Sequence, residues 1–152
     1  MFQMSTKTLW LPLLCGLVCS PVFAGTYEWS AGYAQGVAEH MVDDGNGNDL
    51  NISCSDDGET PVRAYATIAG KAYASEKDPG FDVIVDGERY SNPFFTDCNV
   101  CSQNFPAFWK ALRNANNLQI SAGGKTVKLP TNNLKQVLKP FDSKTNQCRV
   151  TW

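Results

Sequence analysis

The sequence has one histidine and no Gly-x-Ser-x-Gly turn, so it lacks the groups on which most hydrolases depend. His40 would have to serve as the base for any serine or cysteine nucleophile. We expect this histidine on the surface or on an edge strand. The neighbouring carboxylates Asp56 and Asp57 lie between Ser55 and Gly58, in a composition typical of a solvated turn. We therefore predict no catalytic residue.

No apolar run long enough to cross a bilayer follows the N-terminus. The N-terminus itself has one charged residue, Lys7, then a mostly apolar stretch over 9–18 and the small-x-small sequence Val22-Phe23-Ala24. This arrangement is typical of a secretory signal peptide. We expect residues 1–24 to be cleaved and residues 25–152 to form a single exported domain, in the bacterial periplasm or secreted.

Cysteine is sparse after residue 24, where four remain: Cys54, Cys98, Cys101 and Cys148. An even number in an exported chain predicts two disulfides, and three pairings are open from sequence alone. We predict Cys98–Cys101 together with Cys54–Cys148, the second of which would close a long loop. Both pairs are interpreted as structural disulfides.

The Cys-x-x-Cys pair could also be a redox centre or half of a zinc site. Asp97 precedes it, and a nearby carboxylate disfavours a thiolate. Pro106 indicates that the first helical turn begins several residues after the pair, away from the position that would lower a cysteine pKa. Zinc is disfavoured because the other two cysteines are isolated in sequence. A thiol–disulfide oxidoreductase using Cys98 and Cys101 is the alternative to a structural role.

The stretch DDGNGND, residues 43–49, partly resembles a calcium loop. Asp44, Asn46 and Asn48 occupy alternate positions, but Asp49 stands where such a loop needs glycine and Ser55 where it needs glutamate. A solvated hairpin turn is the favoured interpretation, and we predict no metal or cofactor.

Hydrophobic periodicity predicts an α+β fold, mainly antiparallel strands with one amphipathic helix and one short helix, held by disulfides. Residues 27–42 fit both periods and are interpreted as one long, bent strand. Asp86-Gly87 and Gly123-Gly124 predict hairpin turns. The remaining expected elements are strands over 50–54 and 62–68, helices over 105–115 and 134–140, and a closing strand over 148–152.

Aromatic residues gather around the Cys-x-x-Cys pair and are interpreted first as core beneath the disulfide, second as a patch for a partner. They are Phe94, Phe95, Phe105, Phe108 and Trp109.

Charge is unevenly placed along the chain. Residues 25–101 hold 4 Lys and Arg against 14 Asp and Glu, whereas residues 102–152 hold 8 against 1. Two explanations are open: the halves neutralise each other, or one of them faces a charged partner.

The run from FDVIVDGERY through TDCNVC, then FWKALRNANNLQISAGG and KLPTNNLKQVL, resembles small exported bacterial proteins of the invasion-associated locus B type. In these proteins a strand with a "vDG" turn precedes a two-cysteine loop, a helix and a glycine-containing hairpin. The resemblance implies a disulfide-bonded, β-rich periplasmic domain that is not an enzyme, and it supplies no binding residues.

These observations favour a non-enzymatic binding protein of the bacterial envelope, such as an inhibitor, immunity or secretion-accessory protein. The uneven charge indicates a protein partner or an anionic envelope component, and nucleic acid is not expected.

Overall fold

The computed structural model describes residues 25–150, so the predicted signal peptide lies outside the described residues. A five-stranded antiparallel sheet runs in the order β1-β2-β3-β4-β5 and a four-stranded one in the order β7-β6-β8-β9. The first sheet comprises β1 (Ser30–Ala34), β2 (Val37–Asp43), β3 (Asp49–Ser55), β4 (Arg63–Ile68) and β5 (Lys71–Ala74). The second comprises β6 (Asp82–Val85), β7 (Glu88–Tyr90), β8 (Leu118–Ala122) and β9 (Lys125–Leu129).

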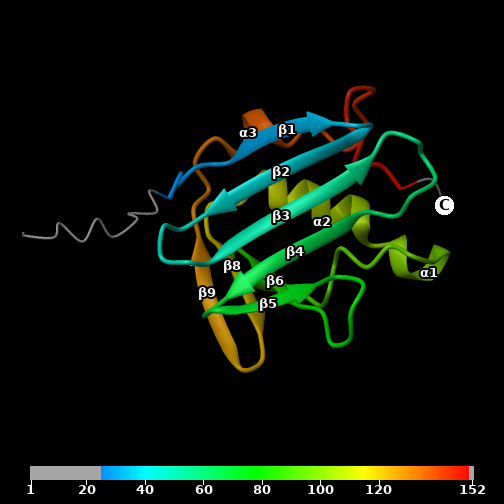
Figure 1. Ribbon diagram of the computed structural model, residues 1–152. Coiled ribbons are helices and arrows are strands. Elements are labelled where there is room, and N and C mark those ends of the chain that lie inside the picture. The colour runs from blue at the N-terminus through cyan, green and yellow to red at the C-terminus, as the bar shows by residue number, and fades with distance from the viewer. Residues whose placement is uncertain (1–24, 151–152) are drawn as a thin grey trace, which may run out of the picture.

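Three helices complete the described chain: α1 (Asn99–Ser102), α2 (Phe105–Arg113) and α3 (Leu134–Val137). In Figure 1 the first sheet lies in front with α2 behind it, β6 passes behind β4 and β5, and β8 and β9 run past the left ends of these strands and on below β5. The predicted α+β class with mainly antiparallel strands is confirmed. No helix among residues 25–150 is long and apolar enough to cross a membrane.

The core lies between the first sheet, α2 and the second sheet. Leu50, Ile52 and Cys54 alternate along β3 and are buried, as their period of two requires. On α2 the apolar stripe packs inward because its members recur at helical spacing. Its buried residues are Phe105, Phe108, Trp109 and Leu112.

The long bent strand predicted over 27–42 is wrong, because the chain forms a tight hairpin there. Ala34 and Val37 are partners at the ends of β1 and β2. Between them Gln35 and Gly36 both have positive φ, 52° and 80°. Such a turn joins two adjacent antiparallel strands directly, so the N-terminal segment adds an edge strand to the sheet.

The C-terminal segment also differs from the prediction. The helix expected to reach Pro140 ends at Val137 in α3, and residues 148–150 are not in a strand. Instead, Cys148 is fully buried, and its amide donates to Oδ1 of Asn146 over 3.0 Å. The tail is therefore held by local hydrogen bonding and by a disulfide.

Candidate functional site

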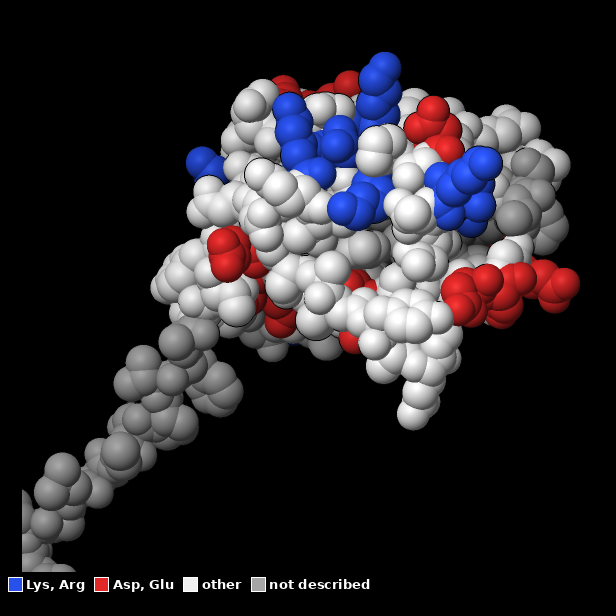
Figure 2. Space-filling view, turned by 90° about the horizontal axis from the view of Figure 1, so that it is seen from above, with Lys and Arg blue, Asp and Glu red and all other residues white. Residues whose placement is uncertain are grey.

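Four basic residues form what we call the cationic face: Lys110 and Arg113 on α2, Lys135 on α3 and Lys139 just after it. Arg113 joins the two helices, because its Nε donates to the Leu138 carbonyl over 2.8 Å and its Nη2 to the Lys135 carbonyl over 3.3 Å. These bonds fix the direction of the guanidinium. In Figure 2, which looks down on the end that holds β1 and α3, Lys and Arg side chains gather in one region with acidic groups mostly towards the edges.

A hollow of about 420 Å³ lies beside this face, between α2 and the segment after α3. Lys110 and Arg113 supply its positive charge and Asp142 its single carboxylate. Its remaining lining residues are Pro106, Asn114, Pro140 and Phe141. The hollow therefore has more positive than negative charge along its lining.

The acidic and basic halves are not joined by ion pairs within residues 25–150. Both ion pairs in this range lie in the acidic half: Arg63 with Asp97 at 2.6 Å, and Arg89 with Asp82 at 2.8 Å. These two ion pairs use Arg63 and Arg89, which are two of the four cations of the acidic half. Asp56 of the acidic half nevertheless lines one hollow together with Lys144 and Arg149 of the basic half. The explanation that the halves pack together and neutralise each other therefore stays a prediction.

Both predicted disulfides are present. Cys54 on β3 joins Cys148 in the C-terminal tail, and both residues are buried. Cys98 joins Cys101 across three residues, and Cys98 is exposed. The first therefore lies within the core and the second at the surface.

Two of the sequence arguments about the Cys-x-x-Cys pair need correction. The first helical turn does not begin several residues later, because α1 starts at Asn99 with Cys98 as its N-cap residue. The Cys101 amide donates to Sγ of Cys98 over 3.1 Å. In addition, the Asp97 carboxylate is bound by Arg63 rather than left as an uncompensated charge.

His40 is not on the surface or on an edge strand, contrary to the prediction. It lies on β2, between β1 and β3, and is only 7% exposed. Its ring packs edge-on against Trp109, with 6.2 Å between the ring centroids. Burial, with a smaller contribution from the nearby Lys139 charge, lowers the pKa of His40 to about 4. The imidazole is therefore neutral at physiological pH and sits in the core.

The stretch over 43–49 forms a closed turn between β2 and β3. Asp44 accepts hydrogen bonds from the Asn46 amide and from both the amide and the side chain of Asn48. The next carboxylate, Asp49, accepts from the Thr67 amide on β4. Among the described residues no group of three His, Cys, Asp or Glu side chains is placed to hold a metal ion.

Among the remaining candidates, the solvated turn predicted around Asp56 and Asp57 is observed. Asp56 and Asp57 are exposed, with Asp57 accepting from the hydroxyl of Thr60 and Asp56 from that of Tyr33. The aromatic cluster is core except for Phe95, which is 39% exposed. The other four rings, Phe94, Phe105, Phe108 and Trp109, are buried and contact one another.

The fold and site together define a small, disulfide-bonded α+β domain with a cationic helical face. A family model described as YfjT matches residues 27–138, well over half of the chain, so the chain belongs to the YfjT family. The matched range includes Cys98 and Cys101 and ends before Cys148. Neither curated proteins nor solved structures give a match. The resemblance to the invasion-associated locus B type stays a prediction.

Proposed function

We propose that this chain is an exported, non-enzymatic binding protein that engages an acidic protein through its cationic face. The observation that carries the proposal is the separation of charge: the cations of α2 and α3 gather on one surface, and both ion pairs of the described chain lie elsewhere. Unpaired surface charge of one sign steers a partner of the opposite sign and favours its orientation. The signal-peptide pattern supports a periplasmic or secreted location, with which the disulfides are compatible.

The site favours a protein partner over a lipid surface. Binding of a protein to a membrane interface combines basic groups with apolar side chains that enter the lipid. The large apolar side chains exposed on the described chain come from other segments. They are Tyr27, Tyr33, Met41, Tyr65, Phe95 and Val100. The cationic face instead has a guanidinium fixed by Leu138 and Lys135, next to a hollow that is lined by two cations. A protruding acidic side chain is the group that such a hollow would attract.

The test compares two charge reversals in the protein without residues 1–24. The first, Lys110→Glu/Lys139→Glu, changes the cationic face and is called the α2–α3 variant. The second, Lys125→Glu/Lys128→Glu, makes the same change in charge at two exposed positions of β9 and is called the β9 variant. Each protein is immobilised, exposed to bacterial envelope extract and washed at rising salt. We expect wild type and the β9 variant to retain the same acidic protein, released by salt, and the α2–α3 variant to lose it.

Two outcomes would overturn the proposal. One is retention of the same proteins by the α2–α3 variant at equal salt. The other is cosedimentation of the wild-type protein with phosphatidylglycerol vesicles, lost in the α2–α3 variant, which would assign the face to lipid. Unchanged thermal unfolding of both variants establishes that they are folded.

A thiol–disulfide oxidoreductase is the second candidate. Cys98 is exposed, the Cys101 amide donates to its sulfur, and Arg63 offsets the charge of Asp97. The hydrogen bond favours a thiolate on Cys98 in the reduced protein, and the pairing of Asp97 with Arg63 removes the carboxylate charge that would disfavour it. Insulin reduction with dithiothreitol as the reductant tests this function: turnover well above the uncatalysed rate, lost in Cys98→Ser, would support it over the binding protein.

A further inference from the structure

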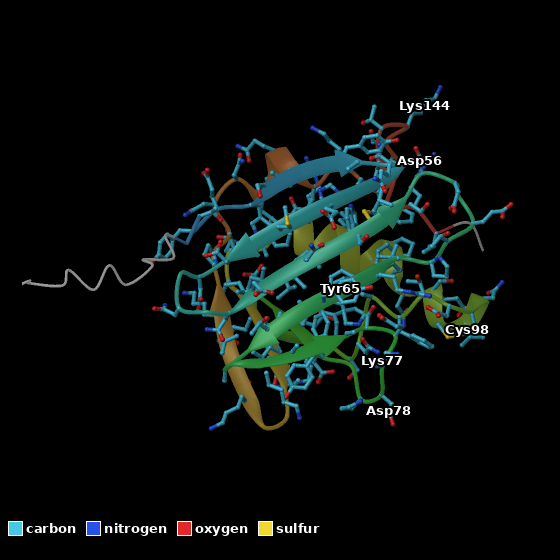
Figure 3. The ribbon with its side chains drawn as sticks, in the orientation of Figure 1. Asp56, Tyr65, Lys77, Asp78, Cys98 and Lys144 are labelled. Carbon is cyan, nitrogen blue, oxygen red and sulfur yellow. A yellow bond between two sulfur atoms is a disulfide. The ribbon has the colours of Figure 1, made fainter. Side chains whose placement is uncertain are left out.

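A second hollow, of about 390 Å³, lies on the first sheet at β4, β5 and the loop that follows β5. Figure 3 labels three of its lining residues, Tyr65 on β4 and Lys77 and Asp78 in the loop, all in the same part of the molecule. It shares no lining residue with the hollow beside the cationic face. The two sites can therefore be tested separately.

The hollow follows from cross-strand pairing between β4 and β5. Tyr65 is opposite Ala74 and Thr67 is opposite Ala72, so the four side chains share one face of the sheet. The two alanines are short, and they leave a depression beside the tyrosine. The Tyr65 ring is 45% exposed and accordingly has surface available to a ligand.

Lys71 and Tyr73 alternate with Ala72 and Ala74 along the edge strand β5, so they border the hollow from its edge, as one of its walls, and their side chains start on the opposite face, towards the second sheet. The Lys71 ammonium lies 5.4 Å from the centroid of the Tyr73 ring, close enough for a cation–π contact. The Tyr73 hydroxyl reaches the β8–β9 turn, where a Cβ added to Gly123 would lie 2.5 Å from its oxygen. The position of this wall thus depends on packing between the sheets.

The opposite wall, Lys77 to Gly80, is fastened at its start. The Lys77 amide donates to the Ala74 carbonyl over 3.1 Å, and Nδ2 of Asn92 donates to the Ser75 carbonyl over 2.9 Å. The Ala64 amide donates to the Ser75 hydroxyl, which is buried. Both walls are therefore in place without a ligand, as is usual for small-molecule sites.

The charges that line the hollow are balanced. Lys71 and Lys77 contribute two positive charges, and Asp49 and Asp78 two negative charges. None of the four is in an ion pair within residues 25–150. The site therefore selects against a ligand with a large net charge of either sign, while still offering strong hydrogen-bond donors and acceptors.

We propose that this hollow binds a neutral saccharide of one or two rings. A pyranose has an apolar C–H face that can stack on the Tyr65 ring, and hydroxyl groups around its edge that can bond to carboxylates and ammonium groups. The volume is within the range of small-ligand sites. A peptide added by strand pairing would bind the backbone edge of β5, whereas Tyr65 and Thr67 lie one strand further in, on the face of the sheet.

The test starts with the intact protein, without residues 1–24, on a glycan array that contains neutral, sialylated and sulphated saccharides. We expect binding to neutral glycans. The best neutral oligosaccharide is then titrated into ¹⁵N-labelled protein, and the amide shifts should concentrate at Tyr65, Thr67, Ala72 and Ala74.

Variants sharpen this test. Tyr65→Ala should weaken the titrated affinity at least tenfold, Tyr65→Phe should retain most of it, and Ala72→Leu should weaken it by filling the hollow. Tyr33→Ala, which removes another exposed tyrosine, is the matched control and should bind like wild type.

Absence of binding to any neutral glycan overturns the proposal, as does a preference for the sialylated or sulphated ones. Shifts confined to other elements, or a neutral dipeptide that binds at Tyr65 more tightly than the saccharide, would also overturn it. None of these outcomes bears on the cationic face. Loss of binding in Lys110→Glu/Lys139→Glu, in contrast, would place the saccharide at that face and not at β4–β5.

Discussion

Arg63 holds both carboxylate oxygens of Asp97, with Nη1 to Oδ1 at 2.6 Å and Nη2 to Oδ2 at 3.1 Å. The pair links the start of β4 to the residue before Cys98. The adjacent Thr96 hydroxyl accepts from the Val62 amide over 3.1 Å, so two consecutive side chains fasten this segment to the sheet. The bidentate geometry orients the loop that carries the exposed disulfide.

This ion pair leads to a prediction about stability. Arg63→Ala and Asp97→Ala should each lower the free energy of unfolding by about 1 kcal/mol, and the double variant should reveal a coupling of about 0.5–1 kcal/mol. The values are modest because the side chains are 26% and 32% exposed. Urea unfolding of all four proteins measures the coupling. Strictly additive losses would show that the contact contributes no pairwise energy.

The two disulfides should differ in their contribution to stability. Cys54–Cys148 spans 94 residues and Cys98–Cys101 spans three. In the chain-entropy account a longer closed loop gives more stabilisation, about 4–5 kcal/mol for the first and about 2 kcal/mol for the second. Cys54→Ala/Cys148→Ala should therefore reduce the unfolding midpoint much more than Cys98→Ala/Cys101→Ala. The reverse order in denaturant titrations would contradict this expectation.

Elements with a strong local signal could be predicted from the sequence. Asp86-Gly87 predicts a hairpin because both residues readily take positive φ, and the structure has 49° and 93° there. The β1–β2 turn was missed because Gln35 is not a turn residue, although it adopts a φ of 52°. Tertiary pairing of Ala34 with Val37 imposes this conformation.

The error on His40 has a similar origin. Ala38, His40 and Val42 occupy alternate positions of β2 and are all buried. The apolar residues on either side of His40 therefore already predicted that its side chain faces the core. Assigning one strand from 27 to 42 hid that β2 has neighbours on both sides. Helix α1 gave no signal because it has four residues and its cap is a cysteine sulfur.

The candidate sites could be predicted only in part from the sequence. The excess of basic residues after Cys101 was evident, but which of them share a surface depends on how Arg113 joins α2 to the segment around α3. The hollow at Tyr65 depends on cross-strand register, since only the pairing places Ala72 and Ala74 beside Thr67 and Tyr65. Neither relationship follows from spacing along the chain.

Asn133 should be more sensitive to alanine than to glycine. Its φ is 65°, in the left-handed region, and its Nδ2 donates to the Trp29 carbonyl over 3.1 Å. Both substitutions lose the bond. Alanine keeps a Cβ in the left-handed region without the tolerance that asparagine has for it, whereas glycine has no Cβ and adopts this conformation freely. The alanine variant should therefore be less stable than the glycine variant by about 1 kcal/mol. Equal stability in urea unfolding would show that the backbone conformation relaxes on substitution.

The buried imidazole should make stability depend on pH. The pKa of His40 is about 4 in the folded protein, below the ordinary value of 6.5 expected on unfolding. Between these values the unfolded chain binds more protons, so the free energy of unfolding rises with pH from about 4 to 6.5, by about 3 kcal/mol in total. Above pH 6.5 both states are neutral at this site and the contribution is constant.

His40→Leu, which keeps an apolar group of similar size against Trp109, isolates this effect from that of the carboxylates. The unfolding free energy of wild type minus that of the variant should fall as the pH is lowered from 6.5 to 4. Above pH 6.5 this difference should be constant. NMR titration of the imidazole in wild type and in Lys139→Gln gives a second measurement. Because the Lys139 charge contributes to the lowering, the variant should have a higher His40 pKa, still well below 6.5 since burial is the larger cause. A His40 pKa near 6.5 in the wild-type protein would mean that water reaches the ring, and that Trp109 of α2 does not cover it.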